Sequence, residues 1–287
     1  MVTVDLTTWE MRPGPELVGY DTFGQVAAVS EGLFFGALMA FYVAAFNTTT
    51  QATVWLSNCS MWPYGGPYFL VDIFPYGQDA LLVVGNYGSA NENVTSIYAL
   101  RSLASGAPVA TLLGNVTCGP NCDDAAFALD SATGGGTLFL VAGQSASAEG
   151  VVDGTLFTVA VPPTGAPTVV SSLPLGGYFE FLQFDPVAQG LVGLTLHTNP
   201  YARNLVTMRN PGAQAWNVTD AGPVGEGLYV VLEDGPKAID AATRRAFFML
   251  ATGPFAEFEV VALNLSTSPP QILGTPGLCG FIGARRE

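Results

Sequence analysis

The sequence predicts an all-β protein built from repeated units of four short strands. No segment combines a helix cap, an amphipathic stripe and a stop signal, as the helices of globular proteins do. Short apolar runs recur instead, each bounded by clusters of Gly, Pro, Asn and Thr. Hydrophobic residues make up 49% of the chain and charged residues 11%, which excludes an intrinsically disordered chain and a coiled coil.

Two elements alternate along the chain and define the repeat. The first is a strand that ends in an aspartate, followed by a short turn and another apolar strand; its aspartates are Asp72, Asp130, Asp185 and Asp240, at intervals of 55 to 58 residues. The second is a hairpin around a Gly- or Pro-containing turn, as at 105–108 and 164–167. The units cover residues 24–58, 66–114, 124–175, 178–221 and 227–275, and the first of them lacks the aspartate.

A fixed period with four strands per unit predicts a β-propeller. One four-stranded sheet has two apolar faces, and only stacking against neighbouring sheets covers both. The pattern resembles the broad β-propeller superfamily, whose blades often carry an apolar-Asp-x-x-x-Gly-apolar run like residues 127–139 here. That superfamily contains enzymes, adhesion modules and scaffolds, so the resemblance implies a fold and no particular activity.

We expect a single propeller domain over residues 1–287, with about six blades of four antiparallel strands. Residues 1–17 and 278–287 are expected to form a sixth blade and so to close the ring. That blade lacks its second strand: it has three strands, or the chain has been trimmed, or a neighbouring chain supplies the missing strand. An open sheet edge accepts strands from other chains, so self-assembly is expected.

Six asparagines stand in the N-x-S/T pattern of N-glycosylation, whereas chance predicts about one or two. This excess indicates a secreted glycoprotein that is extracellular or bound to the cell surface. The asparagines are Asn47, Asn58, Asn93, Asn115, Asn217 and Asn264.

The four cysteines agree with an oxidising compartment. Cys118 and Cys122 flank a Gly-Pro turn and are expected to form a local disulfide, which leaves Cys59 to pair with Cys279. Four cysteines allow three pairings, so this connectivity is one of three. Zinc is disfavoured because the chain has a single histidine.

The charge balance excludes a nucleic-acid binder. The chain has 9 Lys plus Arg against 23 Asp plus Glu, a net charge of −14, and no basic patch that could neutralise phosphates. The most apolar stretch, residues 32–46, is shorter than the roughly 20 residues of a membrane-spanning helix. The first residues lack the pattern of a signal peptide, so we expect the chain to be a mature or trimmed portion of a longer secreted precursor.

The repeated aspartates are expected to cap the turns that follow them, because an aspartate at a strand end can accept backbone N–H bonds. The best candidates for a hard cation are Asp123 and Asp124, beside the Cys118–Cys122 pair. Calcium prefers about six to eight oxygens, and two adjacent carboxylates supply few of them. A solvated acidic loop is therefore the alternative, and calcium is the sole cofactor that the sequence suggests.

Catalytic motifs are absent from the sequence: there is no G-x-S-x-G, Walker loop or H-E-x-x-H. His197 has no accompanying nucleophile and is expected to lie in a loop or at a strand end. The aromatic residues Trp62, Tyr64, Tyr68 and Tyr76 occur in predicted turns near Cys59. They are expected either to contact sugars or proteins, or to plug one end of a central channel.

These observations favour a non-enzymatic role. The sequence predicts a secreted, N-glycosylated structural or interaction module, a subunit of an extracellular or cell-surface assembly such as a matrix, surface layer or filament. Its expected partners are other protein chains, copies of itself included. Two alternatives stay open: a propeller hydrolase that uses a divalent cation, and a carbohydrate-binding, lectin-like propeller that uses the aromatic residues.

Overall fold

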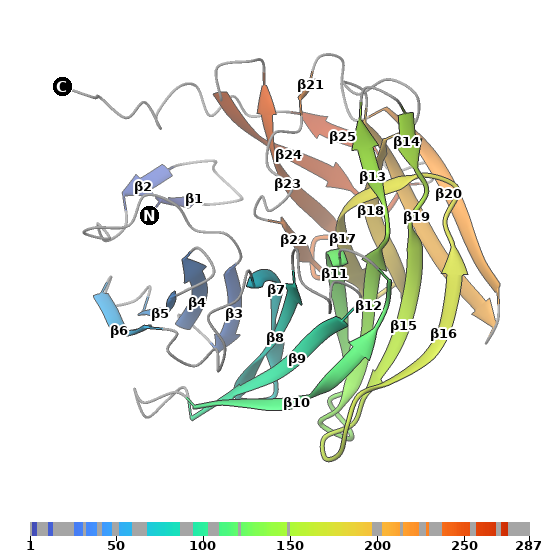
Figure 1. Ribbon diagram of the computed structural model, residues 1–287. Helices are drawn as coiled ribbons and strands as arrows, with labels where there is room; N and C mark the ends of the chain where they lie inside the picture. Colours follow the sequence, from blue (N-terminus) through green and yellow to red (C-terminus); the bar gives the residue numbers. More distant parts are fainter. Residues whose placement is uncertain are drawn as a thin grey trace. The chain divides into compact units, whose positions relative to one another are not determined.

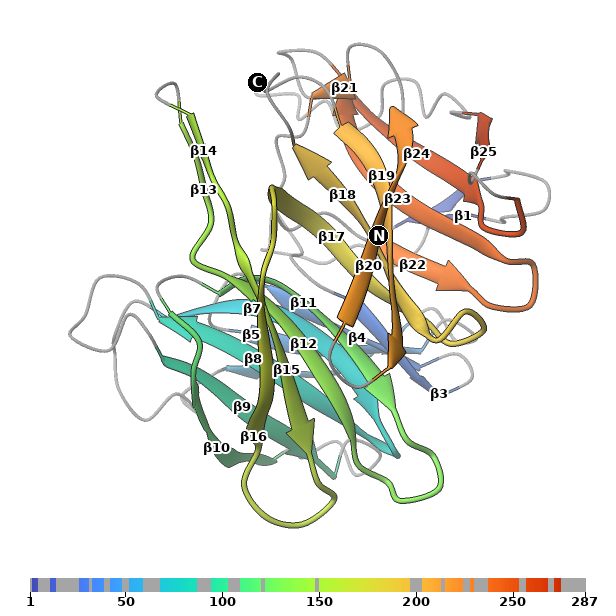
Figure 2. The ribbon, with the colours of Figure 1, turned by 90° about the vertical axis from the view of Figure 1, so that its right-hand side faces the viewer.

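The computed structural model describes the β-strands and many of the turns between them (Figures 1 and 2). The described residues are 2–4, 11–13, 26–30, 33–38, 42–47, 52–58, 68–86, 94–102, 109–119, 122–147, 150–196, 203–212, 215–223, 228–229, 237–252, 257–267 and 271–274. Over these ranges the structure is entirely β-strands and turns, as the sequence predicts. None of these ranges contains a helix with the length and apolar character needed to cross a membrane.

Four sheets in the described part of the chain have four strands each, in a chain order that follows the predicted repeat. The first sheet consists of β3 (Val26–Ser30), β4 (Leu33–Leu38), β5 (Tyr42–Asn47) and β6 (Ala52–Asn58). The second consists of β7 (Tyr68–Tyr76), β8 (Asp79–Asn86), β9 (Val94–Arg101) and β10 (Val109–Thr117). The third consists of β11 (Cys122–Leu129), β12 (Gly136–Ala142), β15 (Thr155–Val161) and β16 (Thr168–Pro174). The fourth consists of β17 (Tyr178–Asp185), β18 (Gly190–Leu196), β19 (Arg203–Gly212) and β20 (Ala215–Pro223).

The fifth sheet has five strands, because two short segments occupy the place of its first strand. Both β21 and β22 pair antiparallel with β23, at opposite ends of that strand. The sheet consists of β21 (Leu228–Tyr229), β22 (Lys237–Asp240), β23 (Arg245–Thr252), β24 (Glu257–Asn264) and β25 (Gln271–Gly274). Two small hairpins complete the strands: β1 (Val2–Val4) with β2 (Met11–Pro13), and β13 (Ser145–Ser147) with β14 (Gly150–Val152).

The expected six blades are not found: the described residues form five sheets of four or more strands. Strands β1 and β2 pair with each other, Val2 opposite Pro13, as expected for the last two strands of a blade. Residues 278–287, which were expected to complete that blade, lie outside the described residues. The closure of the ring therefore stays a prediction.

Contacts divide the chain into two compact units. The first contains Met1–Cys122, Leu129–Leu138 and Thr158–Val170, and the second contains Asp123–Ala128, Phe139–Phe157 and Ser171–Glu287. Each unit is described by itself, and the candidate site lies within the second.

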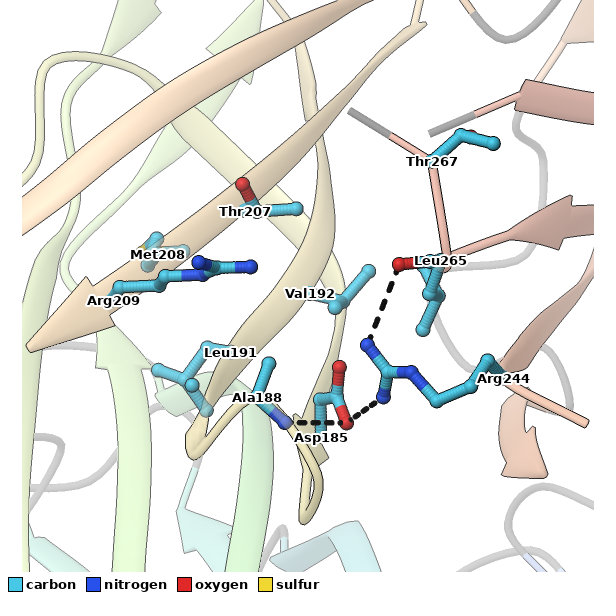
Figure 3. Close-up of a pocket in the computed structure, with 11 residues that line it drawn as sticks. Asp185, Ala188, Leu191, Val192, Thr207, Met208, Arg209, Arg244, Leu265 and Thr267 are labelled. Atoms are coloured by element: carbon cyan, nitrogen blue, oxygen red, sulfur yellow. Dashed lines mark hydrogen bonds and ion pairs between the residues drawn. The ribbon is translucent and has the colours of Figure 1, made fainter. Parts of the chain in front are cut away.

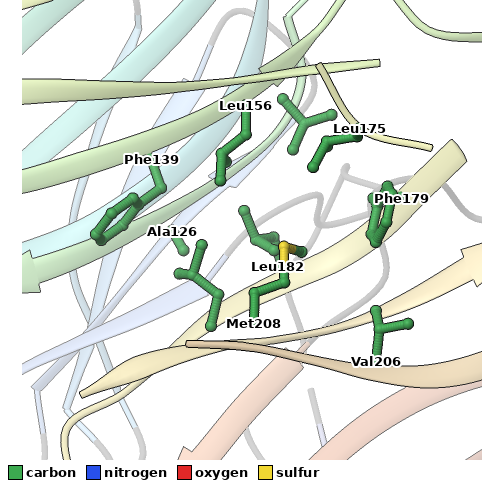
Figure 4. Packing of buried hydrophobic residues seen from close by; sticks show 10 residues of the cluster. Ala126, Phe139, Leu156, Leu175, Phe179, Leu182, Val206 and Met208 are labelled. Atoms are coloured by element: carbon green, nitrogen blue, oxygen red, sulfur yellow. The ribbon is translucent and has the colours of Figure 1, made fainter. Parts of the chain in front are cut away.

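The sheet of β17–β20 is buried on both faces in this second unit. One face contributes Phe179, Leu182, Leu191, Val206 and Met208 to a core shared with residues of β11, β12 and β15 (Figure 4). The other face packs against the sheet that contains β23 and β24, through Phe181, Val192, Leu194 and Leu205. This is the arrangement that the repeat predicts, because a sheet with two apolar faces must be covered twice.

A bulge in β17 reverses the face on which Phe181 lies. The pairing with β18 shifts register between Glu180 and Gln183, and Phe181 has a positive φ of 55°. Phe179 and Phe181, two positions apart, consequently pack into opposite cores instead of sharing one face. The Phe181 ring meets Phe248 edge-on at a centroid distance of 5.9 Å. Bulges of this kind re-aim a side chain at the cost of one ladder position.

The aspartate turns follow one local design in three repeats. Asp130, Asp185 and Asp240 each accept a backbone N–H from the residue two positions later, at 3.0 Å. The residue four positions after each aspartate has a positive φ: 75° at Gly134, 51° at Gln189 and 57° at Arg244. The predicted capping role is confirmed for these three aspartates.

The predicted cap at Asp72 is wrong. Strand β7 continues past Asp72 to Tyr76, and the turn that follows lies at Gly77, where φ is 64°. Asp72 is instead a buried residue of the strand, whose Oδ1 accepts the N–H of Ile73 at 2.7 Å. The tripeptide Leu-Val-Asp matched the other repeats in composition but is displaced from the hairpin turn.

Candidate functional site

A small pocket opens between the β18–β19 hairpin and the turns beside β23 and β24, within the second unit (Figure 3). Its volume is about 50 Å³, several times the roughly 10–15 Å³ that one water needs and far below a drug-sized site. Two arginines and one aspartate are its charged residues. The lining consists of Asp185, Ala188, Gly190, Leu191, Val192, Thr207, Met208, Arg209, Arg244, Leu265 and Thr267.

The turn after β17 places Asp185 at the base of this pocket. Asp185 is 2% exposed, and its Oδ1 accepts the N–H groups of Val187 at 3.0 Å and Ala188 at 3.1 Å. The same oxygen forms an ion pair with the Nη1 of Arg244. The carboxylate is thus compensated by three donors, as a buried charge requires.

Arg244 reaches Asp185 from the corresponding turn of the next repeat. Its Nη2 donates to the Leu265 carbonyl at 3.4 Å, and its own carbonyl accepts the Leu265 N–H at 2.8 Å. Arg244 therefore ties the start of β23 to the end of β24 while its guanidinium holds Asp185. A non-glycine residue with positive φ costs about 1–2 kcal/mol, so the ion pair offsets a local backbone strain.

Burial and hydrogen bonding act on Asp185 in opposite directions. Burial disfavours the carboxylate and raises its pKa, whereas Arg244 and the N–H groups of Ala188 and Val187 stabilise the charged form. The stabilising contacts prevail, and the pKa of Asp185 lies below its usual value. The carboxylate is therefore ionised at neutral pH.

Arg209 and Thr207 form the opposite wall, on β19. Arg209 is exposed, and its guanidinium points toward the pocket from the side facing Arg244 (Figure 3). Its stem passes over Gly190, its partner in the β18–β19 register; a Cβ on Gly190 would stand 2.6 Å from the Met208 carbonyl oxygen and 3.4 Å from Arg209 Cγ. The glycine therefore makes the close approach of the two strands possible.

The proposed calcium ligand Asp124 is already neutralised by the chain's only lysine. Asp124 is 5% exposed on β11; its Oδ1 accepts the Ala125 N–H at 2.7 Å, and its Oδ2 accepts the Leu182 N–H at 2.6 Å. Lys237 binds the same Oδ1 and donates to the Ala125 carbonyl at 3.0 Å. The ammonium thus balances the charge of the carboxylate, and Asp124 connects β11, β17 and β22.

The side chain of Asp123 is outside the described set, and no group of three or more metal-ligating residues occurs among the described residues. The sequence missed the role of Asp124 because its partners are 58 and 113 residues away. Two features of the sequence could have indicated this role: Asp124 is the first residue of a predicted four-strand unit, and Lys237 is the only lysine in the chain.

The aromatic candidates are only partly described, and the predicted turn position is wrong for Tyr68 and Tyr76, which are the first and last residues of strand β7. Tyr76 is 6% exposed, and its hydroxyl donates to the Pro162 carbonyl at 3.1 Å; burial raises the pKa of this tyrosine, although the positive charge of Arg101 opposes that effect. A buried ring offers no stacking surface to a sugar. Trp62, Tyr64, His197 and the side chain of Tyr68 lie outside the described residues.

Three of the six predicted glycosylation sites have described side chains. Asn115 on β10 and Asn217 on β20 are exposed, and Asn264 at the end of β24 is partly exposed. Asn115 accepts a hydrogen bond from Ser96 Oγ at 2.8 Å, and Asn264 Oδ1 accepts the Ser266 N–H at 2.9 Å. Asn93 and the side chains of Asn47 and Asn58 lie outside the described residues.

Cys118 and Cys122 are neighbours, and no disulfide joins them. The hydrogen bond with Cys122 lowers the pKa of the Cys118 thiol; burial opposes this, and Thr95, whose Oγ1 is 3.0 Å from the sulfur, adds to it. Cys59 and Cys279 lie outside the described residues. The structure therefore brings the first pair together without the predicted bond.

Comparison with known proteins identifies the fold. No protein-family model matches the chain, and no curated protein matches its sequence. Among solved structures, the chain resembles the β-propeller domain of Cps50 (Swd1) from Myceliophteria thermophila, with a TM-score of 0.50 at 10% identity over 96% of this chain and 79% of that one. The chain has a β-propeller fold.

Two further structures show the same propeller likeness. A protein of unknown function from Bacteroides caccae matches with a TM-score of 0.54 at 9% identity, over 95% of this chain and 87% of that one. Raptor from Chaetomium thermophilum matches with a TM-score of 0.51 at 11% identity, over 92% of this chain. The propeller spans 25% of the Raptor chain. At these identities the likeness concerns the fold alone.

Proposed function

We propose that this propeller is a secreted, N-glycosylated interaction module that assembles with other protein chains, copies of itself included, outside the cell or at the cell surface. The observation that carries the proposal concerns the last strand of each sheet, β6, β10, β16, β20 and β25, here called the fourth strands. Each stands at the edge of its sheet. Edge strands with exposed apolar side chains are surfaces on which proteins pair.

The fourth strands hold most of the apolar surface among the described residues. Eight large hydrophobic residues are exposed in that part of the chain, and six of them lie on fourth strands. Isolated exposed hydrophobics are ordinary, but their concentration on sheet edges supports an interface. The six are Val109, Leu112, Val169, Val170, Val218 and Leu273.

Glycosylation divides the fourth strands into two classes. Asn115 lies on β10 and Asn217 on β20, both exposed, and Asn58 is the last residue of β6. A glycan at these positions shields the strand edge from other chains. Strands β16 (Thr168–Pro174) and β25 have no such site and no charged residue. Strand β25 has only four residues, whereas β16 has seven, six of them exposed. We infer that β16 is the pairing edge.

Completion of the ring and the disulfide also belong to the proposal. A sixth blade needs strands from 278–287 beside the β1–β2 hairpin, or a strand from another copy. The lowered pKa of Cys118 supports oxidation, because the thiolate is the species that forms disulfides. Neither the hydrolase nor the lectin alternative gains support from the described residues, since Lys237 compensates Asp124 and Tyr76 is buried.

The test is production of the chain in a secreting eukaryotic cell, followed by mass measurement before and after enzymatic removal of N-glycans and by sedimentation over a range of concentrations. We expect occupied sites, a Cys118–Cys122 bond that blocks alkylation, and concentration-dependent association. Val170→Lys places a charge on the β16 edge and should weaken association at least about tenfold.

Val187→Lys is the matched control, because Val187 is 58% exposed but lies in the Asp185 turn rather than on a fourth strand. Its association should equal that of the unmodified chain. A monomer at every concentration, or equal weakening by the two lysine substitutions, contradicts pairing through β16. Unoccupied sites contradict the secreted glycoprotein.

A further inference from the structure

The pocket of Figure 3 has a charge opposite to that of the chain around it. The chain carries a net charge of −14, yet two of its nine basic residues converge on this one small volume. Asp185 offsets one of them, and it is the sole acidic residue of the lining. With Arg209 and Arg244, the pocket keeps one positive charge in excess.

The excess positive charge of the pocket belongs to Arg209. Within the described residues its guanidinium has no hydrogen-bond or ion-pair partner, whereas Arg244 is bound to Asp185 and to the Leu265 carbonyl. Arg244 is therefore held in place by these contacts, and its side chain is 20% exposed. Arg209 stands across from it with all its N–H donors available.

Neutral groups beside Arg209 suit an anion as well. Thr207 lies two positions before Arg209 on β19, so both side chains leave the same face of the strand. Ala188, Leu191, Val192 and Leu265 supply apolar walls beside the charge. The volume of about 50 Å³ accommodates the head of one small anion and no larger ligand.

We propose that this pocket binds a carboxylate, gripped by Arg209 with the Thr207 hydroxyl and with Arg244 behind it. A guanidinium matches a carboxylate with two parallel N–H bonds, which makes arginine the preferred partner of this group. The carboxylate has two possible sources, a free small acid or an acidic sugar.

The position of the glycosylation sites relates the pocket to the second source. Asn217 on β20 is the register partner of Arg209, and Asn264 directly precedes Leu265 of the lining. Sugars attached at these two residues would begin on either side of the pocket. An acidic sugar of the chain's own glycan can then fold back onto Arg209; this source rests on the glycosylation proposed above, and the free acid does not.

The experiment uses the full chain without glycans and calorimetric titration with D-glucuronate, acetate and, as the neutral match, D-glucose. We expect glucuronate and acetate to bind at millimolar concentration and glucose not to bind. Arg209→Gln removes the unused charge and should weaken glucuronate binding at least about tenfold, as for hydrogen bonds to charged groups. Arg101→Gln, at an exposed arginine of β9 outside the lining, should leave it unchanged.

Three results would contradict the proposal that this pocket binds a carboxylate: no binding of either acid, equal binding by Arg209→Gln and the unmodified chain, or equal weakening by both arginine substitutions. The glycosylated chain then identifies the source. Unchanged glucuronate binding assigns the site to free acids, and binding that returns only after removal of acidic sugars assigns it to the glycan. The first titration uses unglycosylated protein, so its result does not depend on glycosylation. If the asparagines of the secreted chain carried no glycans, the proposed function would be contradicted, but the titration would still test the pocket.

Discussion

The turns at Asp130 and Asp185 have the same local design and different surroundings. Asp130 is exposed, and its carboxylate is satisfied within its own turn by the Ala132 N–H and the Thr133 hydroxyl. Asp185 is buried and receives, besides two amides of its turn, the guanidinium of Arg244 from the next repeat. One sequence motif therefore serves as a turn cap in one blade and as a tie between sheets in another.

The deciding difference lies four residues after the aspartate of the following turn. In the Asp240 turn this position is Arg244, at φ 57°, and it reaches back to Asp185. In the Asp185 turn it is Gln189, at φ 51°, whose Nε2 donates to the Pro186 carbonyl at 2.6 Å within the same turn. At Arg244, a backbone conformation that favours glycine is thus adopted by a residue whose side chain bonds to the neighbouring blade.

Removal of the tie should have the largest effect. Arg244→Ala leaves Asp185 buried without its counter-charge, and we expect the free energy of unfolding to fall by about 3 kcal/mol in denaturant titrations. Arg245→Ala, the neighbouring and partly exposed arginine, should cost less than about 1 kcal/mol. Equal losses for the two variants would show that Asp185 is not held by Arg244.

Gly135 and Gly190 occupy the same position in two of the turns, five residues after the aspartate. A Cβ at Gly135 would stand 2.7 Å from the Val161 carbonyl oxygen, and one at Gly190 would stand 2.6 Å from that of Met208. We expect Gly135→Ala and Gly190→Ala each to destabilise the fold by about 2 kcal/mol, measured by urea unfolding. Gly190→Ala alone should also displace Arg209 and weaken carboxylate binding; a loss of binding in both variants would contradict the pocket's position.

Acid should affect the two aspartates to different extents. The pKa of Asp185 is lowered in the folded chain, so the unfolded chain takes up this proton first as the pH falls through about 4. The stabilisation is complete above that pH and disappears as the pH falls through the folded-state pKa. We expect Asp185→Asn to flatten the acid limb of stability against pH and to cost about 1 kcal/mol at neutral pH.

Asp130→Asn is the matched control for this experiment. The Thr133 hydroxyl, followed by the Ala132 N–H, lowers the pKa of Asp130, so the sign of its pH dependence is the same. Its carboxylate is exposed, so the change should be the smaller of the two. A steeper acid limb in Asp185→Asn than in the unmodified chain would contradict the ion pair.

The smallest effect is expected at Gln189. Gln189→Gly relieves the positive φ but removes the bond to Pro186 and adds freedom to the unfolded chain, so the stability should stay within about 0.5 kcal/mol. Gly134→Ala, at the same position of the Asp130 turn, has no such compensation and should cost about 1 kcal/mol. Thermal unfolding of both variants checks the pair.

The repeat allowed the all-β propeller fold and three capping aspartates to be predicted from local pattern alone. Each of those features depends on residues within one hairpin, and a hairpin has a sequence pattern that can be recognised. Asp72 shows the limit of this approach, because a matching tripeptide sat in the middle of β7 rather than at its end.

The candidate site was not predicted because its parts are distant in the chain. Arg244 lies 59 residues from Asp185. The sequence Arg244-Arg245 does not indicate which of the two arginines binds the aspartate. That choice follows from the positive φ at Arg244 and from the packing of β17–β20 against β23 and β24, and both are properties of the folded chain.

Lys237 has a practical consequence of its own. It is the chain's single lysine, its side chain is 7% exposed, and its amine is bound to Asp124 and to the Ala125 carbonyl. An amine-reactive label can modify this lysine only when β22 separates from β11. The rate of labelling at Lys237 therefore measures how often this part of the propeller opens, with no engineered probe in the molecule.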